Sequence, residues 1–135
     1  MAYKISEIEG IGPASAEKLA AADIGTTDDL LSLCSDAKGR KATAEKAGVS
    51  ESQLLKWANM ADLMRVSGIG GEYAELLKAS GVDTIKELRT RNAENLAEKA
   101  KQINEAKSLT RVVPSASVIS GWISKAKEME PKITH

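Results

Sequence analysis

The pattern of hydrophobic and polar positions predicts helices along almost the whole chain. Between residues 50 and 65, apolar side chains such as Leu54 and Trp57 recur about every 3.6 residues, which is the period of an α-helix. The same spacing predicts further helices after Asn92 and after Ser115. Alternation of polar and apolar residues, which is typical of strands, is essentially absent. We therefore predict an all-α protein.

Residues that favour helix ends support this prediction. Pro13 suits the first turn of a helix, where its missing N–H group has no hydrogen bond to lose. Thr26 and Thr84 each precede acidic residues, a combination that caps a helix and complements its dipole. Ser50 with Gln53 matches a capping box.

Two segments of the sequence repeat each other. Residues 8–19 align with residues 66–77 without a gap, and both contain the tripeptide Gly-Ile-Gly. We call residues 8–12 the first glycine turn, because they contain Gly10-Ile11-Gly12. Residues 66–70, with Gly68-Ile69-Gly70, are the second glycine turn.

A second match extends the repeat over nearly the whole chain. Residues 50–64 align with residues 115–129 and place Trp57 opposite Trp122, both of which we expect in the core. We predict two copies of one unit in one compact helical body that shares the helix of about residues 50–65. The predicted units are residues 1–58 and 59–135.

Composition limits the function classes that remain. The chain has 135 residues, with 19 basic and 19 acidic side chains, so its formal net charge is zero. Nucleic-acid binders that rely on electrostatics usually carry a marked basic excess, although a local patch is still compatible with neutrality. Solvated basic runs occur at residues 38–46 and 86–111, and Arg89, Arg91 and Arg111 are the first candidates for DNA contacts in them.

The chemistry of the glycine turns favours anion binding. Glycine permits a tight turn with positive φ, and the isoleucine between the glycines can point inward and fix the turn. The first N–H groups of the helix that follows are then unpaired and lie at the positive end of its dipole. Such a helix terminus is a ready site for a phosphate group.

The segment Ile8-Glu9-Gly10-Ile11-Gly12-Pro13, continued by Ala16-Glu17-Lys18-Leu19, resembles the helix–hairpin–helix motif of DNA repair and recombination proteins. Residues 8–31 are similar to the N-terminal domain of RadA and related recombinases. Residues 5–129 resemble an uncharacterised bacterial family of unknown function built from tandem helix–hairpin–helix modules. The resemblance implies two tandem helix–hairpin–helix (SAM-domain-like) units.

The resemblance also implies main-chain contacts to DNA phosphates without base readout. In the first glycine turn and the helix after it, the implied nucleic-acid-binding residues are Gly10, Ile11, Gly12, Ala14, Ser15 and Lys18. In the second they are Gly68, Gly70 and Gly71. Glu72 stands in the first turn of the second helix, where a carboxylate satisfies the dipole and repels phosphate. We therefore expect the first glycine turn to be the better phosphate site.

Other site chemistry is not expected. The sequence has one histidine, His135, and one cysteine, Cys34, which we expect to be buried, so we predict no metal site, no cofactor and no catalytic triad. No P-loop ending follows the glycines. We predict a protein that is not an enzyme; a nuclease would need a metal-binding carboxylate cluster assembled from distant residues. No secretory signal or membrane-spanning run is recognisable, so we expect a cytoplasmic protein without a membrane partner.

Two functions remain open. The first is weak, sequence-independent DNA binding through the glycine turns. The alternative is a protein-interaction or scaffold domain that retains the fold without DNA binding. It is suggested by Glu72, by the neutral pI and by the apolar residues of the shared helix, because these cannot all face one core and the remainder could form a partner surface. These residues are Leu54, Leu55, Trp57, Met60 and Met64. The sequence leaves the oligomeric state open.

Overall fold

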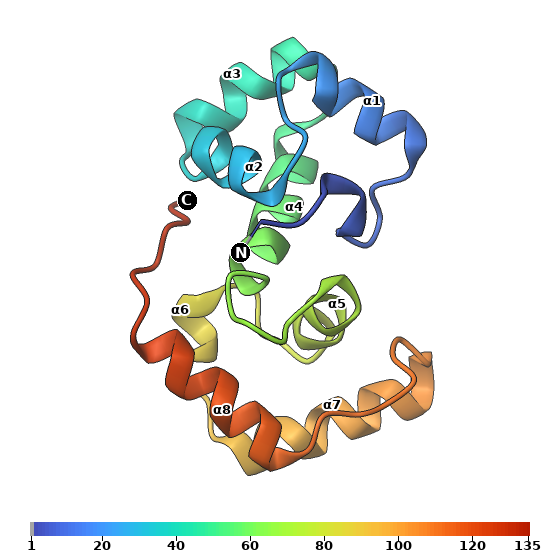
Figure 1. Cartoon of the computed structure of the whole chain (residues 1–135), viewed down its shortest axis with the longest axis vertical. Coiled ribbons are helices and arrows are strands. Elements are labelled where there is room, and N and C mark those ends of the chain that lie inside the picture. The colour runs from blue at the N-terminus through green and yellow to red at the C-terminus, as the bar shows by residue number, and fades with distance from the viewer. Residues whose placement is uncertain (1) are drawn as a thin grey trace.

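The computed structural model describes residues 2–135, and its regular structure is entirely helical (Figure 1). In that range one isolated bridge, between Lys4 and Thr26, is the only β-type pairing. The all-α prediction is therefore confirmed. The elements are η1, a 3-10 helix (Ile5–Glu7), α1 (Pro13–Ala21), α2 (Thr27–Cys34), α3 (Ala37–Ala47), α4 (Glu51–Leu63), α5 (Gly71–Ala79), α6 (Ile85–Leu88), α7 (Ala93–Lys107) and α8 (Ala116–Lys127).

Helix α4 lies at the centre of the molecule. It packs against α2 and α3 on one side and against α5 on the other, and Figure 1 shows it between the group α1–α3 and the group α5–α8. The predicted boundary between residues 58 and 59 falls inside this helix. Because α4 belongs to the core of both groups, neither group has a complete core without it.

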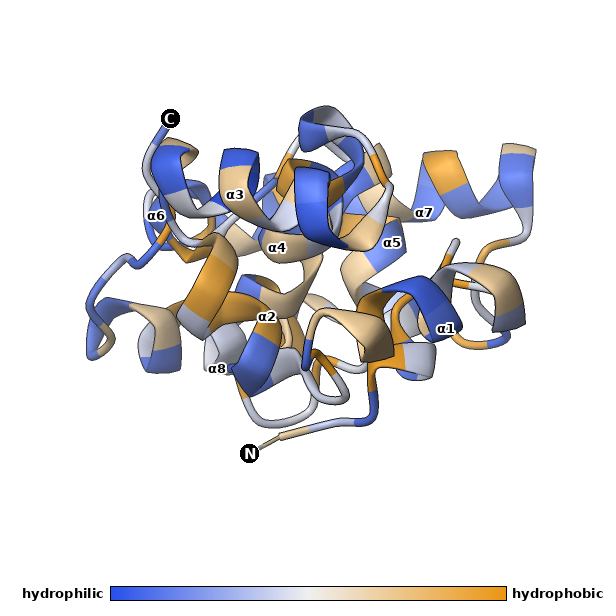
Figure 2. Cartoon of the chain, turned by 90° about the horizontal axis from the view of Figure 1, so that it is seen from above, coloured by the Kyte–Doolittle hydropathy of each residue, from blue (hydrophilic) through white to orange (hydrophobic). Residues whose placement is uncertain are grey.

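The expectation that the apolar residues of α4 form a partner surface is wrong. Trp57, Met60 and Met64 are at most 3% exposed, Leu54 is fully buried, and Leu55 is partly buried. A helix that is packed on two sides buries apolar residues around most of its circumference, so these side chains need no partner. In Figure 2 hydrophilic and hydrophobic residues alternate along the outer helices, which bury one face each.

The predicted helix caps are present. Thr26 and Ser50 each accept a hydrogen bond from the third amide of their helix and close a capping box, with Asp29 and Gln53 as the returning acceptors. Asn92 caps α7 through a 3.0 Å bond from the amide of Asn95. These bonds satisfy amides that a helix cannot pair internally.

The last residues of the chain return to the first group of helices (Figure 1). The amide of Thr134 donates to the carbonyl of Ser35 at 2.8 Å, and Ile133 is buried. Arg40 donates to the carbonyls of Cys34, Ser35 and Thr134 at 3.1, 3.0 and 2.6 Å. Arg40 is only 4% exposed, so the expectation that it belongs to a solvated basic run is wrong.

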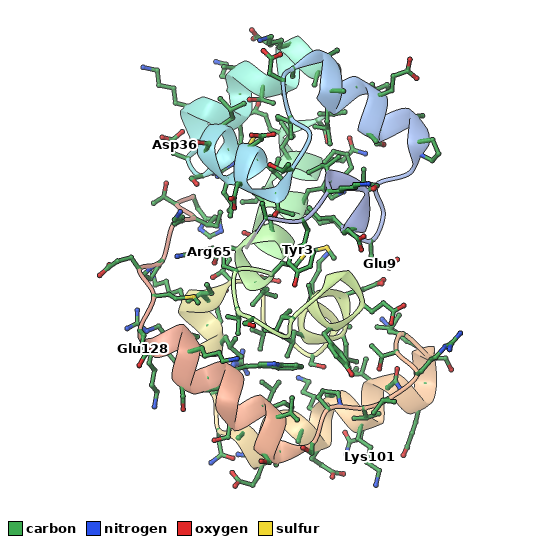
Figure 3. The ribbon with its side chains drawn as sticks, in the orientation of Figure 1. Tyr3, Glu9, Asp36, Arg65, Lys101 and Glu128 are labelled. Atoms are coloured by element: carbon green, nitrogen blue, oxygen red, sulfur yellow. The ribbon has the colours of Figure 1, made fainter. Side chains whose placement is uncertain are left out.

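Arg65 makes a second connection to this returning segment. Its guanidinium donates to the carbonyl of Glu130 at 3.0 Å and to the carboxylate of Asp62 at 2.7 Å (Figure 3). Asp62 is buried and also accepts the amide of Ile85 at 2.9 Å, which fixes the start of α6. The second group of helices is therefore tied to the end of α4 through one carboxylate.

Candidate functional site

The two glycine turns have matching backbone geometry. Gly10 has φ +94° and Gly68 has φ +99°, a region that favours glycine. In the first turn the amide of Ile11 donates to the carbonyl of Ile8 at 3.2 Å, and in the second the amide of Ile69 donates to the carbonyl of Val66 at 3.0 Å. Ile11 and Ile69 are buried, as predicted for the residue between the glycines.

A tryptophan lies against each turn. A methyl group on Gly10 would lie 3.9 Å from Nε1 of Trp57, and one on Gly68 would lie 3.0 Å from Nε1 of Trp122. Both indoles are buried, so the prediction that they belong to the core is confirmed. Each glycine turn is thus supported from inside by the corresponding tryptophan, from α4 or from α8.

The helices after the two turns begin without a side-chain cap. Their N-cap residues are Gly12 for α1 and Gly70 for α5, and neither can supply an acceptor. Elsewhere the N-cap side chain or a returning carboxylate accepts an amide of the helix start. The starts of α1 and α5 therefore lack the side-chain acceptor that the other α-helices of residues 2–135 have.

The start of α1 is open to solvent. Gly12, Pro13 and Ala14 are exposed and Ser15 is partly buried. Among residues 2–135, no group accepts a hydrogen bond from the amides of Gly12, Ala14 or Ser15. The exposed Lys18 follows one turn later. This end of α1 offers unpaired donors and a positive dipole end, the properties that bind an anion.

The start of α5 is covered by the first turn. Gly71 is buried, and a methyl group there would lie 1.9 Å from the carbonyl oxygen of Glu7. Glu7, Glu9 and Glu72 line the hollow around the second glycine turn, and Figure 3 shows Glu9 projecting beside α5. A buried helix start surrounded by three carboxylates is a poor site for phosphate.

The predicted arginines have other partners. Arg89 donates to the carbonyl of Lys127 at 3.3 Å, and Arg91 donates to the carbonyl of Gly81 at 2.8 Å. Both side chains hold chain segments together, while Arg111 is exposed. These arginines are not part of the first glycine turn.

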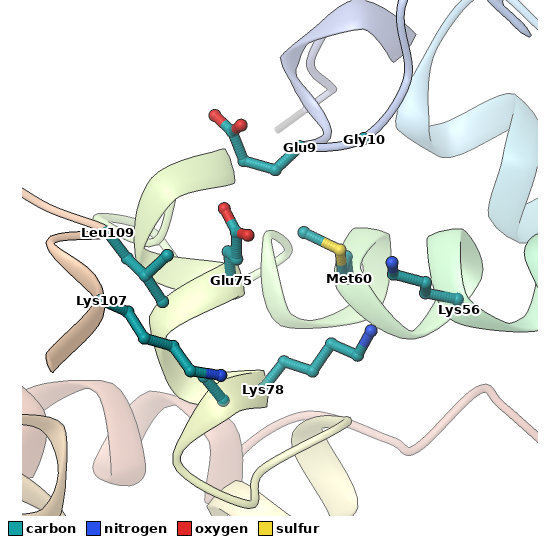
Figure 4. Close-up of a pocket in the computed structure, with 9 residues that line it drawn as sticks. Glu9, Gly10, Lys56, Met60, Glu75, Lys78, Lys107 and Leu109 are labelled. Carbon is teal, nitrogen blue, oxygen red and sulfur yellow. The ribbon is translucent and has the colours of Figure 1, made fainter. Parts of the chain in front are cut away.

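Three lysines beside the first glycine turn were missed by the sequence analysis. Lys56, Lys78 and Lys107 line one cleft together with Gly10 (Figure 4). Lys56 and Lys78 come from α4 and α5 and lie outside the basic runs of the sequence, whereas Lys107, at the end of α7, belongs to the run at residues 86–111. Only the packing of these helices places the three lysines along one cleft.

Cys34 is buried, as predicted, and burial raises the pKa of its thiol. Its side chain packs as a small apolar group in the first group of helices. Within residues 2–135, no three His, Cys, Asp or Glu side chains are arranged to hold a metal ion. In the same range, none of the helices combines the length and the apolar character required for a membrane crossing.

Comparison with protein families gives one match. The profile of a domain of unknown function, DUF4332, matches residues 9–129. The chain belongs to the DUF4332 family. The matched range begins in the first glycine turn and ends just after α8, so the DUF4332 domain includes both turns and all eight α-helices. No curated protein and no solved structure matches the chain.

Proposed function

We propose that this DUF4332 protein is a non-enzymatic helix–hairpin–helix protein that binds DNA weakly and without sequence preference. The observation that carries the proposal is the start of α1, where the amides of Ala14 and Ser15 are unpaired and accessible. A backbone phosphate can accept hydrogen bonds from such amides at the positive end of the dipole. Contacts of this kind carry no base specificity.

The likeness of the two glycine turns supports the helix–hairpin–helix interpretation. Both turns have a glycine with positive φ, a buried isoleucine and an uncapped helix after them. We infer that they are copies of one unit that arose by internal duplication. In this proposal only the first copy contacts DNA, because Gly71 and its neighbours are covered by the first turn.

The alternative of a protein-interaction domain has lost one of the three observations that suggested it, while Glu72 and the zero net charge remain. The apolar residues of α4 that suggested a partner surface are in the core. The large apolar side chains that are exposed within residues 2–135 are Leu33, Val112 and Val118, on different segments of the chain. Single exposed apolar residues are normal on a protein surface and do not indicate a partner.

The experiment is a titration of the full chain with labelled duplex and branched DNA at low and moderate salt. We expect binding at low salt that weakens as salt rises, because phosphate contacts release counterions. We expect little difference between DNA sequences. No binding at low salt would overturn the proposal.

One substitution tests the site itself. Ala14 occupies the position in α1 that Glu72 occupies in α5, so Ala14→Glu gives the first turn the carboxylate of the second. We expect Ala14→Glu to weaken DNA binding and to lower the salt slope by about 1. The matched control is Ala14→Gln, which has similar size and helix propensity but no charge. Equal loss in both variants, or no loss in either, would contradict the assignment.

A further inference from the structure

A cleft with three lysines lies beside the first glycine turn. Its volume is about 270 Å³. Figure 4 shows the ammonium groups of Lys56 and Lys78 pointing toward one another, with Lys107 next to Lys78. The carboxylates of Glu9 and Glu75 gather at the other end of the cleft. Positive and negative groups are thus separated along the cleft.

The three ammonium groups lack ion-pair partners. The ion pairs of residues 2–135 are those of Lys46 with Asp23 and of Arg65 with Asp62, neither of them in the cleft. Burial lowers the pKa of Lys78, and the neighbouring ammonium of Lys56 lowers it further. Glu75 and Asp83 offset only part of this effect on Lys78. The repulsion between neighbouring ammonium groups is relieved when an anion binds between them.

The floor of the cleft is apolar. Met60 is 1% exposed, and Ala79 and Leu109 are partly buried beside the lysines. An apolar surface lowers the effective dielectric constant near the ammonium groups. Lys78 is partly buried, so an anion beside it interacts with it more strongly than with a lysine on an open surface, whereas Lys56 and Lys107 are exposed.

We propose that this cleft binds a phosphate group, held by Lys56, Lys78 and Lys107 beside Gly10. Lysine binds phosphate as a compact point charge, whereas planar carboxylates are matched better by the fork of arginine. The phosphate can belong to a small molecule or to a nucleic-acid backbone, and the inference does not depend on phosphate binding at the start of α1.

The two glutamates give the cleft a direction. Because Glu9 and Glu75 repel an anion, a bound phosphate is confined to the lysine end. The substitution Glu75→Gln removes one of these charges, so we expect it to strengthen phosphate binding. The control is Glu45→Gln on the exposed face of α3, away from the cleft, which leaves binding unchanged.

The test is a titration of the full chain with inorganic pyrophosphate, followed by NMR. We expect the amide signals of Gly10 and Ala79 to shift, because both residues line the cleft. In the double variant Lys56→Met/Lys78→Met we expect affinity to fall by about tenfold or more. The matched control, Lys38→Met/Lys41→Met, removes the same charge from exposed positions of α3 and should bind as the unmodified chain does.

The pKa of Lys78 provides a second measurement, and a general loss of charge elsewhere on the protein does not change it. The ammonium of Lys78 points toward Lys56 (Figure 4), and the carboxylates of Glu75 and Asp83 also act on it. A bound phosphate favours the charged lysine, so the pKa of Lys78 should rise when pyrophosphate is added. A carbon-13 titration of the lysine side chains measures this change.

A short single-stranded oligonucleotide identifies the source of the phosphate. If the cleft binds backbone phosphate, the oligonucleotide causes the same shifts, and the double variant loses them while Ala14→Glu keeps them. If the cleft binds a small ligand, pyrophosphate causes these shifts and the oligonucleotide does not. Failure of DNA binding with intact pyrophosphate binding overturns the proposed function only. Absence of shifts with both ligands, or equal losses in the two double variants, overturns the lysine cleft.

Discussion

The absence of a side chain on Gly71 allows the start of α5 to pack against Glu7 at the end of η1. The carbonyl of Glu7 occupies the space where a Cβ would lie, at 1.9 Å from it. Sequence reasoning assigned Gly71 to the phosphate site, because its contact with Glu7 depends on chain segments far apart in sequence. The positive φ of Gly10 and Gly68, in contrast, follows from the local turn and was predictable.

The substitution Gly71→Ala tests this contact. We expect it to lower the free energy of unfolding by about 1–3 kcal/mol, because the backbone at Glu7 must move. Chemical denaturation measures the change. The control is Gly121→Ala within α8, where the new methyl group meets no atom within 4 Å. There we expect a gain of about 0.5–1 kcal/mol from the better helix former. If Gly71→Ala is as stable as the original chain, the close contact between Gly71 and the carbonyl of Glu7 is not needed for stability.

At the scale of the helices, the start of α2 depends on a carboxylate. Asp29 accepts the amides of Gly25 and Thr26 at 3.0 and 3.1 Å, and these bonds, with the hydroxyl of Thr26, lower its pKa from the ordinary 3.8. A carboxyl group whose pKa is lower in the folded state stabilises the fold above its ordinary pKa. That stabilisation is lost as the pH falls through the folded-state value.

We therefore expect Asp29→Asn to destabilise the protein at neutral pH and to have a smaller effect below pH 3.8. Urea unfolding of both proteins across this range measures the difference. The exposed Asp28, in the same first turn, provides the control Asp28→Asn, since it accepts no such pair of amides. A difference that stays constant with pH would contradict the role of the charged cap.

Helix ends were predictable because their signals are local. Thr26 with Asp29 and Ser50 with Gln53 lie three residues apart, so one turn of the chain contains the whole interaction. The surroundings of α4 were not predictable in this way. Its period of apolar residues indicated one buried face, whereas packing on two sides buries Met60 as well. The lysine cleft was missed for the same reason, since its lysines lie on three helices.

At the scale of the whole molecule, the returning segment at residues 130–134 connects the two groups of helices. It places Ile133 and the carbonyl of Thr134 on the side of α2 and α3, where Arg40 is buried. In the sequence, this segment is marked only by Pro131, which cannot continue a helix. Where the segment goes afterwards depends on the arrangement of both groups, which is a property of the assembled fold.

Deleting residues 132–135 tests this connection. We expect unfolding to become easier by about 3 kcal/mol, from the lost burial of Ile133 and from the loss of one of the three carbonyl acceptors of the buried Arg40. Thermal and urea unfolding measure the change, and deletion of the exposed His135 alone is the control. In an Arg40→Met background the same deletion should cost less, because the side chain at position 40 no longer donates a hydrogen bond to Thr134. If the deletion lowers the free energy of unfolding equally in both backgrounds, the contact between Arg40 and Thr134 does not hold this segment in place.

The two tryptophans that lie behind the glycine turns also allow each turn to be observed on its own. Trp57 and Trp122 are the two tryptophans of the chain, and each indole N–H lies next to the glycine of its own turn. Indole emission responds to charge and solvent close to the ring. Replacing one tryptophan by phenylalanine therefore leaves a fluorophore that reports on a single turn. The protein contains an optical probe for each half without any added label.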